Sequence, residues 1–327
     1  MADRVIVVFL LLGLLTEITV ASATLDFTCI TKPRINIDDE DTYIAAYLHG
    51  SNGSLSFRQT LAPAGTDHNT ETLPPNSSLL ATAQSLQESA VFNKLELPVT
   101  GGKTRIGAFD CDVTMAGGGS SSITTIIMSS KADFVPRRAS LTANLGDAVN
   151  LKVTAADLNS QKYRWRKDGS ESIRSQKNQL SYDLYNVTNS SSGIYEVHLN
   201  GKRRDGSQAL MQLIVRDCKQ SKWNPPSCNM DCPTCLNGGV CDDTNGDCIC
   251  PPGFSGDLCK IPEGPNRFGQ TGSFRCDSPE LGGGPTCAGT LFCLPDPYGC
   301  SCAAGYQGID CNESKYRFQA VIEILVK

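Results

Sequence analysis

The middle of the chain alternates apolar and polar side chains with the two-residue period of β-strands. Val149-Asn-Leu-Lys-Val153 and Tyr163-Arg-Trp165 both place an apolar residue at every second position. Asp168-Gly169 follows the second segment, and this dipeptide is a strong signal for a tight turn between strands. Because successive side chains of a strand point to opposite faces of its sheet, residues 134–216 predict a series of strands separated by turns.

Two aromatic residues narrow this pattern to one kind of sandwich. Trp165 takes the place of the strand C tryptophan of immunoglobulin-like domains, and Ser192-Gly-Ile-Tyr195 resembles the tyrosine corner before their strand F. Val153 and Val197 stand where that fold usually has its two cysteines. Losing both cysteines keeps an apolar core, whereas losing one would leave a free thiol. We therefore expect an immunoglobulin-like domain without its disulfide.

An earlier sandwich is predicted from Cys29 and Cys111, which we expect to form a bridge. Gly107-Ala-Phe-Asp-Cys111 has the shape of a strand F, with phenylalanine where tyrosine is usual. Leu73-Pro-Pro-Asn76 suggests an inserted loop, and Val135-Pro-Arg137 suggests the junction with the second sandwich.

The first residues contain an apolar run from Val5 to Leu15, followed by the small residues Ala21-Ser-Ala23. A charged start, an apolar stretch and a small-x-small end are typical of a secretory signal peptide. The alternative is a membrane-spanning helix, which needs about 20 apolar residues, but Thr16 and Glu17 interrupt the run. We expect cleavage near Thr24 and a secreted protein, held at the cell surface only if a longer isoform carries a membrane span.

The number and clustering of the cysteines are the most informative features of the composition. Fourteen of the 16 cysteines lie between Cys218 and Cys311, and an even, clustered set in an oxidising compartment indicates disulfides. Zinc is the alternative, because Cys232-Pro-Thr-Cys235 has the spacing of a ligand pair. A signal peptide argues against a thiolate zinc site, so we expect no metal and no cofactor. Glycosylation sequons indicate the same compartment, and they begin at Asn52, Asn76, Asn186, Asn189 and Asn312.

The cysteine spacing contains an internal repeat. Gaps of 5, 6, 1 and 8 residues separate Cys235, Cys241, Cys248, Cys250 and Cys259, and they recur at Cys287, Cys293, Cys300, Cys302 and Cys311. The two sets are offset by 52 residues, and Cys232 and Cys276 complete them. Six cysteines that end in C-x-C-x8-C form the pattern of EGF-like domains. Spacing alone leaves about fifteen pairings open for six cysteines.

The resemblance to EGF-like domains implies that the first cysteine pairs with the third, the second with the fourth and the fifth with the sixth. The implied pairs are Cys232–Cys241, Cys235–Cys248 and Cys250–Cys259, then Cys276–Cys293, Cys287–Cys300 and Cys302–Cys311. Cys218 and Cys228 remain and are expected to pair with each other. Many EGF-like domains bind calcium through acidic and amide residues before the first cysteine. Asp231 alone does not make such a site, so we expect no calcium binding.

The order of modules and the local sequence resemble the extracellular region of the Tie receptor tyrosine kinases, which bind angiopoietins. The most specific matching segments are Cys235-Leu-Asn-Gly-Gly-Val-Cys241, Cys248-Ile-Cys-Pro-Pro-Gly-Phe254 and Phe292-Cys-Leu-Pro-Asp-Pro-Tyr-Gly-Cys-Ser-Cys302. The resemblance implies a mainly β fold, with two immunoglobulin-like β-sandwiches followed by two disulfide-rich EGF-like modules. In the family, the second EGF-like repeat carries an extra disulfide. Its cysteines would fall at Glu263 and Gly272, so that bridge is absent here.

The expected organisation follows from these patterns. It is a signal peptide at 1–23, immunoglobulin-like domains at 24–132 and 133–217, EGF-like repeats at 218–260 and 261–312, and a C-terminal tail at 313–327. We expect none of the family's later modules in these 327 residues, namely the third repeat, the fibronectin-like domains, the membrane span and the kinase. The tail segment Ala320–Val326 is far too short to span a bilayer. A natural soluble form, a secreted relative and a truncated gene model all stay open as explanations.

The resemblance implies that a ligand docks on the second immunoglobulin-like domain, at the loop Asp168, Gly169, Ser170, Glu171 and Ser172. The implied partner is an extracellular, angiopoietin-like protein with a fibrinogen domain, and association with a receptor of the same family is also implied. Glu171 replaces an apolar aromatic residue of the family, which leaves the identity of the ligand open. The alternative is that this segment is only a solvated hairpin turn.

Other functions fit the sequence less well. A matrix or adhesion protein built from the same modules is the second hypothesis, and a hydrolase is the third. His49, His68 and His198 lie in no motif with serine, cysteine or aspartate partners, so we expect no enzyme. The net charge of −5 does not indicate nucleic-acid binding, which usually needs a strongly basic domain. The basic runs Arg164–Lys167 and Lys202–Arg204 are candidates for a sulfated-glycan patch, although solvated strand edges are the simpler explanation.

Overall fold

The computed structural model describes residues 25–50, 53–62, 84–87, 90–155, 162–170, 172–219, 221–278 and 286–315. Within these ranges the regular structure consists of β-strands and short 3-10 helices. Several predictions fall outside them, namely those on the signal peptide at 1–23, Asn52, His68, Leu73–Asn76, Glu171 and Ala320–Val326.

The first sandwich consists of two sheets packed face to face. Its strands are β1 (Asp26–Thr31), β2 (Arg34–Ile35), β3 (Thr42–His49), β4 (Gly53–Leu61), β5 (Gln84–Gln87), β6 (Ala90–Leu97), β7 (Gly107–Met115) and β8 (Ser120–Ser129), with the 3-10 helix η1 (Val99–Arg105) before β7. One sheet contains β1, β3, β6 and β5, and the other has the order β2-β8-β7-β4. Cys29 on β1 bonds to Cys111 on β7, so this disulfide joins the two sheets. Phe27, Ile44 and Phe109 belong to the buried core between them.

The second sandwich has valines where the first has its cysteines. Its elements are β9 (Phe134–Pro136), β10 (Ser140–Asn144), β11 (Val149–Ala155), β12 (Tyr163–Lys167), η2 (Arg174–Gln176), β13 (Ser181–Leu184), η3 (Asn189–Ser191), β14 (Gly193–Leu199), η4 (Arg203–Asp205) and β15 (Ala209–Arg216). The sheets are β10-β15-β14-β12 and β13-β11-β9. Val153 on β11 and Val197 on β14 come from opposite sheets and share one core with Trp165. Both valines are completely buried, which fits the expected apolar replacement of the disulfide.

Tyr195 forms the predicted tyrosine corner at the start of β14. Its hydroxyl donates to the carbonyl oxygen of Ser191, 2.8 Å away and 4 residues upstream. Burial raises the pKa of Tyr195, so the hydroxyl keeps its proton and stays a donor. The indole Nε1 of Trp165 donates to the carbonyl oxygen of Gln179 at 2.7 Å. Because their polar groups are paired, both rings can lie in the core.

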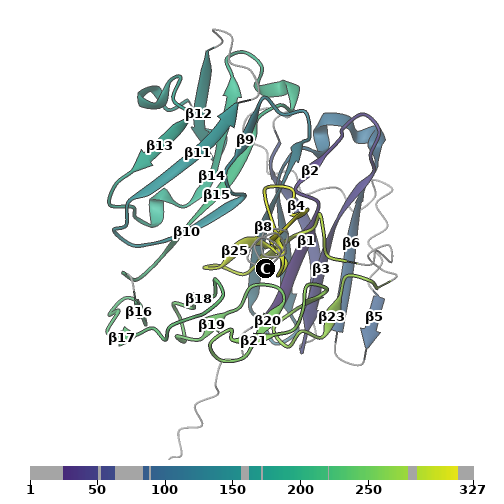
Figure 1. Cartoon of the computed structure of the whole chain (residues 1–327), viewed down its shortest axis with the longest axis vertical. Coiled ribbons are helices and arrows are strands. Elements are labelled where there is room, and N and C mark those ends of the chain that lie inside the picture. Colours follow the sequence, from purple (N-terminus) through teal and green to yellow (C-terminus); the bar gives the residue numbers. More distant parts are fainter. Residues whose placement is uncertain are drawn as a thin grey trace, which may run out of the picture.

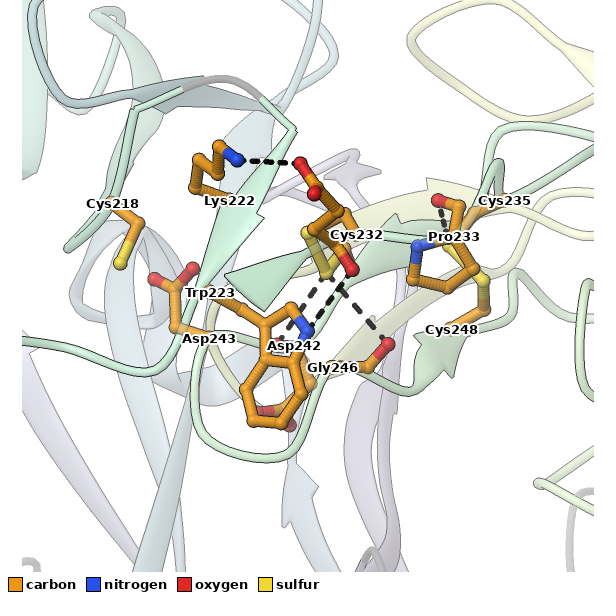
Figure 2. Close-up of a disulfide and its surroundings, with 12 residues drawn as sticks. Cys218, Lys222, Trp223, Cys232, Pro233, Cys235, Asp242, Asp243, Gly246 and Cys248 are labelled. Carbon is orange, nitrogen blue, oxygen red and sulfur yellow. Dashed lines mark hydrogen bonds and ion pairs between the residues drawn. A yellow bond between two sulfur atoms is a disulfide. The ribbon is translucent and has the colours of Figure 1, made fainter. Parts of the chain in front are cut away.

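The first EGF-like repeat is held together by its disulfides. Its short strands are β16 (Lys222–Trp223), β17 (Met230–Asp231), β18 (Val240–Cys241), β19 (Cys248–Ile249), β20 (Phe254–Ser255) and β21 (Ile261–Pro262). The bonds are Cys218–Cys228, Cys232–Cys241, Cys235–Cys248 and Cys250–Cys259, the same pairs as predicted. Trp223 lies beside Gly246, where an added Cβ would come within 2.4 Å of the indole (Figure 2). Its Nε1 donates to the carbonyl oxygen of Asp231 at 3.2 Å.

Arg216 fixes this repeat to the second sandwich. The side chain lies at the end of β15 and is buried. Its guanidinium donates to the carbonyl oxygens of Cys241 and Lys222, each at 3.0 Å, and pairs with Asp243 at 2.5 Å. Asp243 also accepts from the backbone N–H of Asp217 at 2.7 Å. A paired, buried arginine therefore ties the two modules together.

The second EGF-like repeat differs from the prediction in its disulfides. Its strands are β22 (Arg267–Phe268), β23 (Phe274–Arg275), β24 (Leu291–Leu294), β25 (Gly299–Cys302), β26 (Tyr306–Gln307) and β27 (Glu313–Ser314). The bonds are Cys276–Cys287, Cys293–Cys300 and Cys302–Cys311, so the predicted pairs Cys276–Cys293 and Cys287–Cys300 are wrong. The reason is strand register. Cys293 on β24 directly faces Cys300 on β25, with their Cα atoms 3.9 Å apart, so each is the other's neighbour.

The second repeat packs against the first sandwich by extending its sheet (Figure 1). Strand β24 pairs antiparallel with β1, which places Ile30 opposite Phe292. Phe268 and Phe292 are completely buried in a cluster with Ile30 and Tyr47. The ring centroids of Tyr47 and Phe268 are 5.0 Å apart. Small disulfide-rich modules bury little apolar surface alone, so this contact gives the repeat a core that it cannot build itself.

The same repeat also contacts the second sandwich. The hydroxyl of Thr142 donates to the carbonyl oxygens of Pro297 at 2.8 Å and Tyr298 at 3.0 Å. The hydroxyl of Ser140 donates to the carbonyl oxygen of Cys300 at 3.1 Å and accepts from its N–H at 2.7 Å. Strand β25 thus lies between the two sandwiches (Figure 1). The modules contact one another and do not simply follow in a row.

Candidate ligand-binding surface

The predicted ligand loop begins at the end of β12, where the chain turns back. Asp168 and Gly169 both have positive φ angles, 48° and 69°. The N–H of Ser170 donates to the carbonyl oxygen of Lys167 at 2.9 Å, which closes a tight turn. Left-handed backbone is easy for glycine and tolerated by aspartate, so the Asp-Gly sequence suits this turn.

The carboxylate of Asp168 is used inside the domain. Its Oδ1 accepts a hydrogen bond from the N–H of Ile194 at 2.7 Å, while the Asp168 N–H donates to the Ile194 carbonyl oxygen at 2.8 Å. Its Oδ2 pairs with the Nζ of Lys167 at 2.7 Å. Asp168 therefore ties the loop to β14, and its side chain supports the turn.

Gly193 makes room for this carboxylate. Its φ angle is 145°, and an added Cβ would lie 2.4 and 2.5 Å from the two oxygens of Asp168. Any side chain at this position would push the carboxylate away from the Ile194 N–H. Glycine is thus required here by a close approach as well as by the backbone.

The loop also lies against the first sandwich. An added Cβ on Gly169 would come within 3.2 Å of the Leu61 side chain. Behind the loop, Ile194 and Leu210 of the second sandwich belong to the same buried cluster as Leu61 of the first. The contact between the two sandwiches therefore sets the direction in which the loop points.

The predicted site is exposed to different degrees along the loop. Asp168 and Ser170 are exposed, Gly169 and Ser172 are half-buried, and Glu171 lies outside the described residues. The structure brings Asp168, Gly169 and Ser170 together in one turn. Within this turn, Asp168 holds the backbone in place through Ile194, and the Asp168 and Ser170 side chains are both accessible to a partner.

The two basic runs meet at one buried carboxylate. Glu196 on β14 is completely buried. Its Oε1 lies 2.5 Å from the Nε of Arg203 and 3.8 Å from the Nε of Arg166. Lys167 pairs with Asp168. These three cations have carboxylate partners inside the domain, while Lys202 and Arg204 are exposed, so the hypothesis of a sulfated-glycan patch stays a prediction.

His198 is buried beside this network. Its Nε2 lies 3.3 Å from the Nε of Arg166, and its Nδ1 lies 2.9 Å from the carbonyl oxygen of Leu199. Because arginine can only donate, Nε2 accepts and Nδ1 carries the proton. Burial lowers the pKa of His198, which favours this neutral form. The ring is thus held as a structural donor and acceptor on β14.

The described ranges contain neither a metal site nor a membrane-spanning helix. No group of three or more histidine, cysteine or carboxylate side chains there is arranged to hold a metal ion. Cys232 and Cys235, the candidate zinc ligands, are both in disulfides. None of the helices in these ranges combines the length and the apolar character needed to cross a membrane.

Comparison with known proteins agrees with this architecture. A family model described as EGF-like domain matches residues 228–259. The angiopoietin-1 receptor of Danio rerio is 38% identical over 198 residues, which cover 59% of this chain and 17% of that receptor. The resemblance to the Tie ectodomain is confirmed. This chain spans less than a fifth of the receptor's length, so the match does not extend to the whole receptor.

Other similarities of this chain are more partial. The putative EGF-like and EMI domain-containing protein 1 of Homo sapiens is 32% identical over 87 residues, covering 27% of this chain and 41% of that protein. The N-terminal four Ig domains of Dscam1 isoform 4.44 match with a TM-score of 0.21 and 14% identity, over 50% of this chain and 37% of that one. The immunoglobulin-like fold is established here by the sheets and the core of this chain itself.

Sequence reasoning missed the residues that hold the loop in place. Gly193 was singled out only as part of the tyrosine corner, although its position opposite an Asp-Gly turn is equally important. Leu61 carried no signal at all, because its contact with Gly169 joins residues 108 positions apart. Packing contacts between residues this far apart leave no local pattern in the sequence.

Proposed function

We propose that this chain is an extracellular, non-enzymatic ectodomain of the Tie type that binds an angiopoietin-like ligand with a fibrinogen domain. The observation that carries this proposal is the 38% identity over 198 residues to a receptor named for angiopoietin-1. Association with a membrane-bound receptor of the same family is part of the proposal. The proposed docking site is the loop at 168–172 in the second sandwich.

The geometry of the loop supports this role. The backbone at 168–170 is fixed by the Asp168 carboxylate and by contact of Gly169 with the first sandwich. A rigid loop loses little conformational entropy when a partner binds, so more of the contact energy contributes to affinity. The exposed position of Ser170 leaves the tip of this rigid turn accessible.

Binding to an immobilised angiopoietin fibrinogen domain tests the proposal. The wild-type chain should bind saturably in an interferometry experiment. Ser170→Arg should weaken binding at least tenfold, because a long cation at the tip of the turn prevents close docking. Thr244→Arg is the matched control, since Thr244 is an exposed hydroxyl residue in a turn of the first EGF-like repeat, and it should bind like the wild type.

Each failure in this experiment has a separate meaning. If the wild-type chain does not bind, the ligand proposal is wrong and the matrix or adhesion hypothesis becomes the better one. If Ser170→Arg binds as well as the wild type, the loop is not the docking site.

Secretion is tested independently of binding. Expression of the full chain in animal cells should release protein into the medium, with an N-terminus near Thr24. Retention of the unprocessed chain inside the cell would contradict the extracellular assignment.

A further inference from the structure

A polar groove of about 580 Å³ lies where the first sandwich meets the second EGF-like repeat. Residues between 31 and 43 form the sandwich wall, and residues 288–290, 310 and 312 form the wall of the repeat. Ligand sites usually have volumes of about 300–1,000 Å³. The groove is therefore large enough for a bound group of several rings.

Most charged groups of the groove already have partners, and Asp41 accepts from the backbone N–H of Val99. Arg34 reaches across the module boundary to Asp310 at 3.0 Å and also donates to the carbonyl oxygen of Ser130 at 2.7 Å. Lys32 pairs with Glu40 on the sandwich side. A charged ligand would have to compete with these pairs. A neutral, polar ligand would instead use the hydroxyl and amide groups around them.

One residue of this groove is a potential point of covalent attachment. Asn312 lines the groove, is exposed, and begins the sequon Asn312-Glu-Ser314. Its side-chain amide is thus a candidate acceptor for an N-linked glycan. The first sugars of such a glycan, two N-acetylglucosamine rings, are neutral and carry hydroxyl and amide groups.

We propose that Asn312 carries an N-linked glycan whose inner N-acetylglucosamine rings lie in this groove and bridge the first sandwich and the second EGF-like repeat. The transfer uses an oligosaccharide donor linked to a lipid diphosphate. The bond between Nδ2 and the sugar C1 forms, the bond between C1 and the diphosphate oxygen breaks, and the amide loses one proton. This inference rests on the extracellular location proposed above.

The groove offers suitable partners for these sugars. Asn36 and Thr290, both half-buried, supply amide and hydroxyl groups, and Tyr43 supplies a half-buried aromatic ring, over which Lys94 Nζ lies 4.4 Å from the centroid. The attachment to Asn312 makes binding intramolecular. A short tether gives effective concentrations in the millimolar range, so individually weak sugar contacts suffice to keep the glycan in place.

Release of the glycan by peptide-N-glycosidase tests the proposal directly, because the enzyme must reach the bond between asparagine and the first sugar. The full chain is secreted from animal cells, and site-specific release is followed by mass spectrometry. Release at Asn312 should be at least tenfold slower in the native protein than after denaturation. Asn186, which is exposed on the second sandwich, is the reference site and should show a much smaller ratio.

A variant in the wall of the groove separates this contact from other causes of slow release. Thr290→Trp fills the groove and should bring native release at Asn312 close to the denatured rate, whereas Thr290→Ser should not. Equal native and denatured rates in the wild type, slow release that persists in Thr290→Trp, or an unmodified Asn312 beside a modified Asn186 would each overturn the proposal. A chain that is neither secreted nor glycosylated at any site would instead contradict the extracellular location.

Discussion

Cys29 on β1 and Cys293 on β24 lie directly opposite each other in a strand pair, although each is bonded to a different cysteine. Cys29 bonds to Cys111 across the first sandwich, and Cys293 bonds to Cys300 within the second EGF-like repeat. Two disulfides therefore meet where two modules share a sheet. The cysteine pairing of the repeat and its packing on the sandwich are parts of one feature.

The disulfide pairing of the second repeat can be measured directly. Proteolysis at acidic pH without reductant, followed by mass spectrometry, should recover Cys276 linked to Cys287 and Cys293 linked to Cys300. The physical reason is the register of β24 and β25, which places Cys293 opposite Cys300. Recovery of Cys276 linked to Cys293 would show that the repeat has the usual EGF-like pairing instead.

The apolar contact between the second repeat and the first sandwich should carry a large share of stability. Phe292 is completely buried against Ile30 and Tyr47. Phe292→Ala should lower the free energy of unfolding by about 3–5 kcal/mol, measured by chemical denaturation. Leu236→Ala is the control, because Leu236 is 42% exposed, and it should change stability by no more than about 0.5 kcal/mol. Similar values for the two variants would mean that the repeat does not dock as described.

The fit between Gly193 and Asp168 predicts a specific effect on the loop. Gly193→Ala places a methyl group on the carboxylate and should lower the free energy of unfolding by more than about 2 kcal/mol. Gly201→Ala is the matched control, since its φ angle is also positive, 81°, but nothing lies within 4 Å of its added Cβ. Its cost should be limited to about 1–2 kcal/mol for the left-handed backbone. Stability is measured by thermal and chemical unfolding. If the two variants lose the same free energy of unfolding, the Asp168 contact is not the cause of the loss.

The positions of the missing family disulfide are close in space. An added Cβ on Gly272 would lie 2.8 Å from the Cγ and the carboxyl carbon of Glu263. The double variant Glu263→Cys/Gly272→Cys should therefore form a bond, detected by peptide mapping, and gain up to about 2–4 kcal/mol, less the strain of a cysteine at positive φ. Glu263→Ser/Gly272→Ser is the control without a bond. Free thiols at both positions in the oxidised protein would contradict the observed proximity.

Buried His198 predicts a dependence of stability on pH. Its folded-state pKa is lowered by burial, so the unfolded chain binds its proton at a higher pH than the folded chain does. Stability is complete above the unfolded pKa of about 6.5 and falls as the pH drops below it, by at most about 1.4 kcal/mol per pH unit. His198→Gln should reduce this slope in denaturant titrations between pH 7.5 and 5.5. An unchanged slope would show that another group is responsible.

The sequence by itself determined the features that depend on local pattern. Alternating residues around Val153 and Trp165 gave the strands of the second sandwich, and Tyr195 gave its corner. The spacing from Cys232 to Cys259, with the resemblance it supports, gave the same disulfides in the first repeat that the structure contains. These features are short-range, because side-chain period, turn geometry and loop closure act between residues that are near in the chain.

Tertiary structure alone decided how the modules combine and what holds the candidate site. The pairing of β24 with β1 set the surroundings of the second repeat. There Cys293 bonds to Cys300, and not to Cys276 as the resemblance to EGF-like domains implies. Gly193 and Leu61 fixed the loop through contacts with Asp168 and Gly169. These contacts join residues distant in sequence, and their free energy depends on shape and burial between whole modules. No periodicity, spacing or local motif encodes that fit.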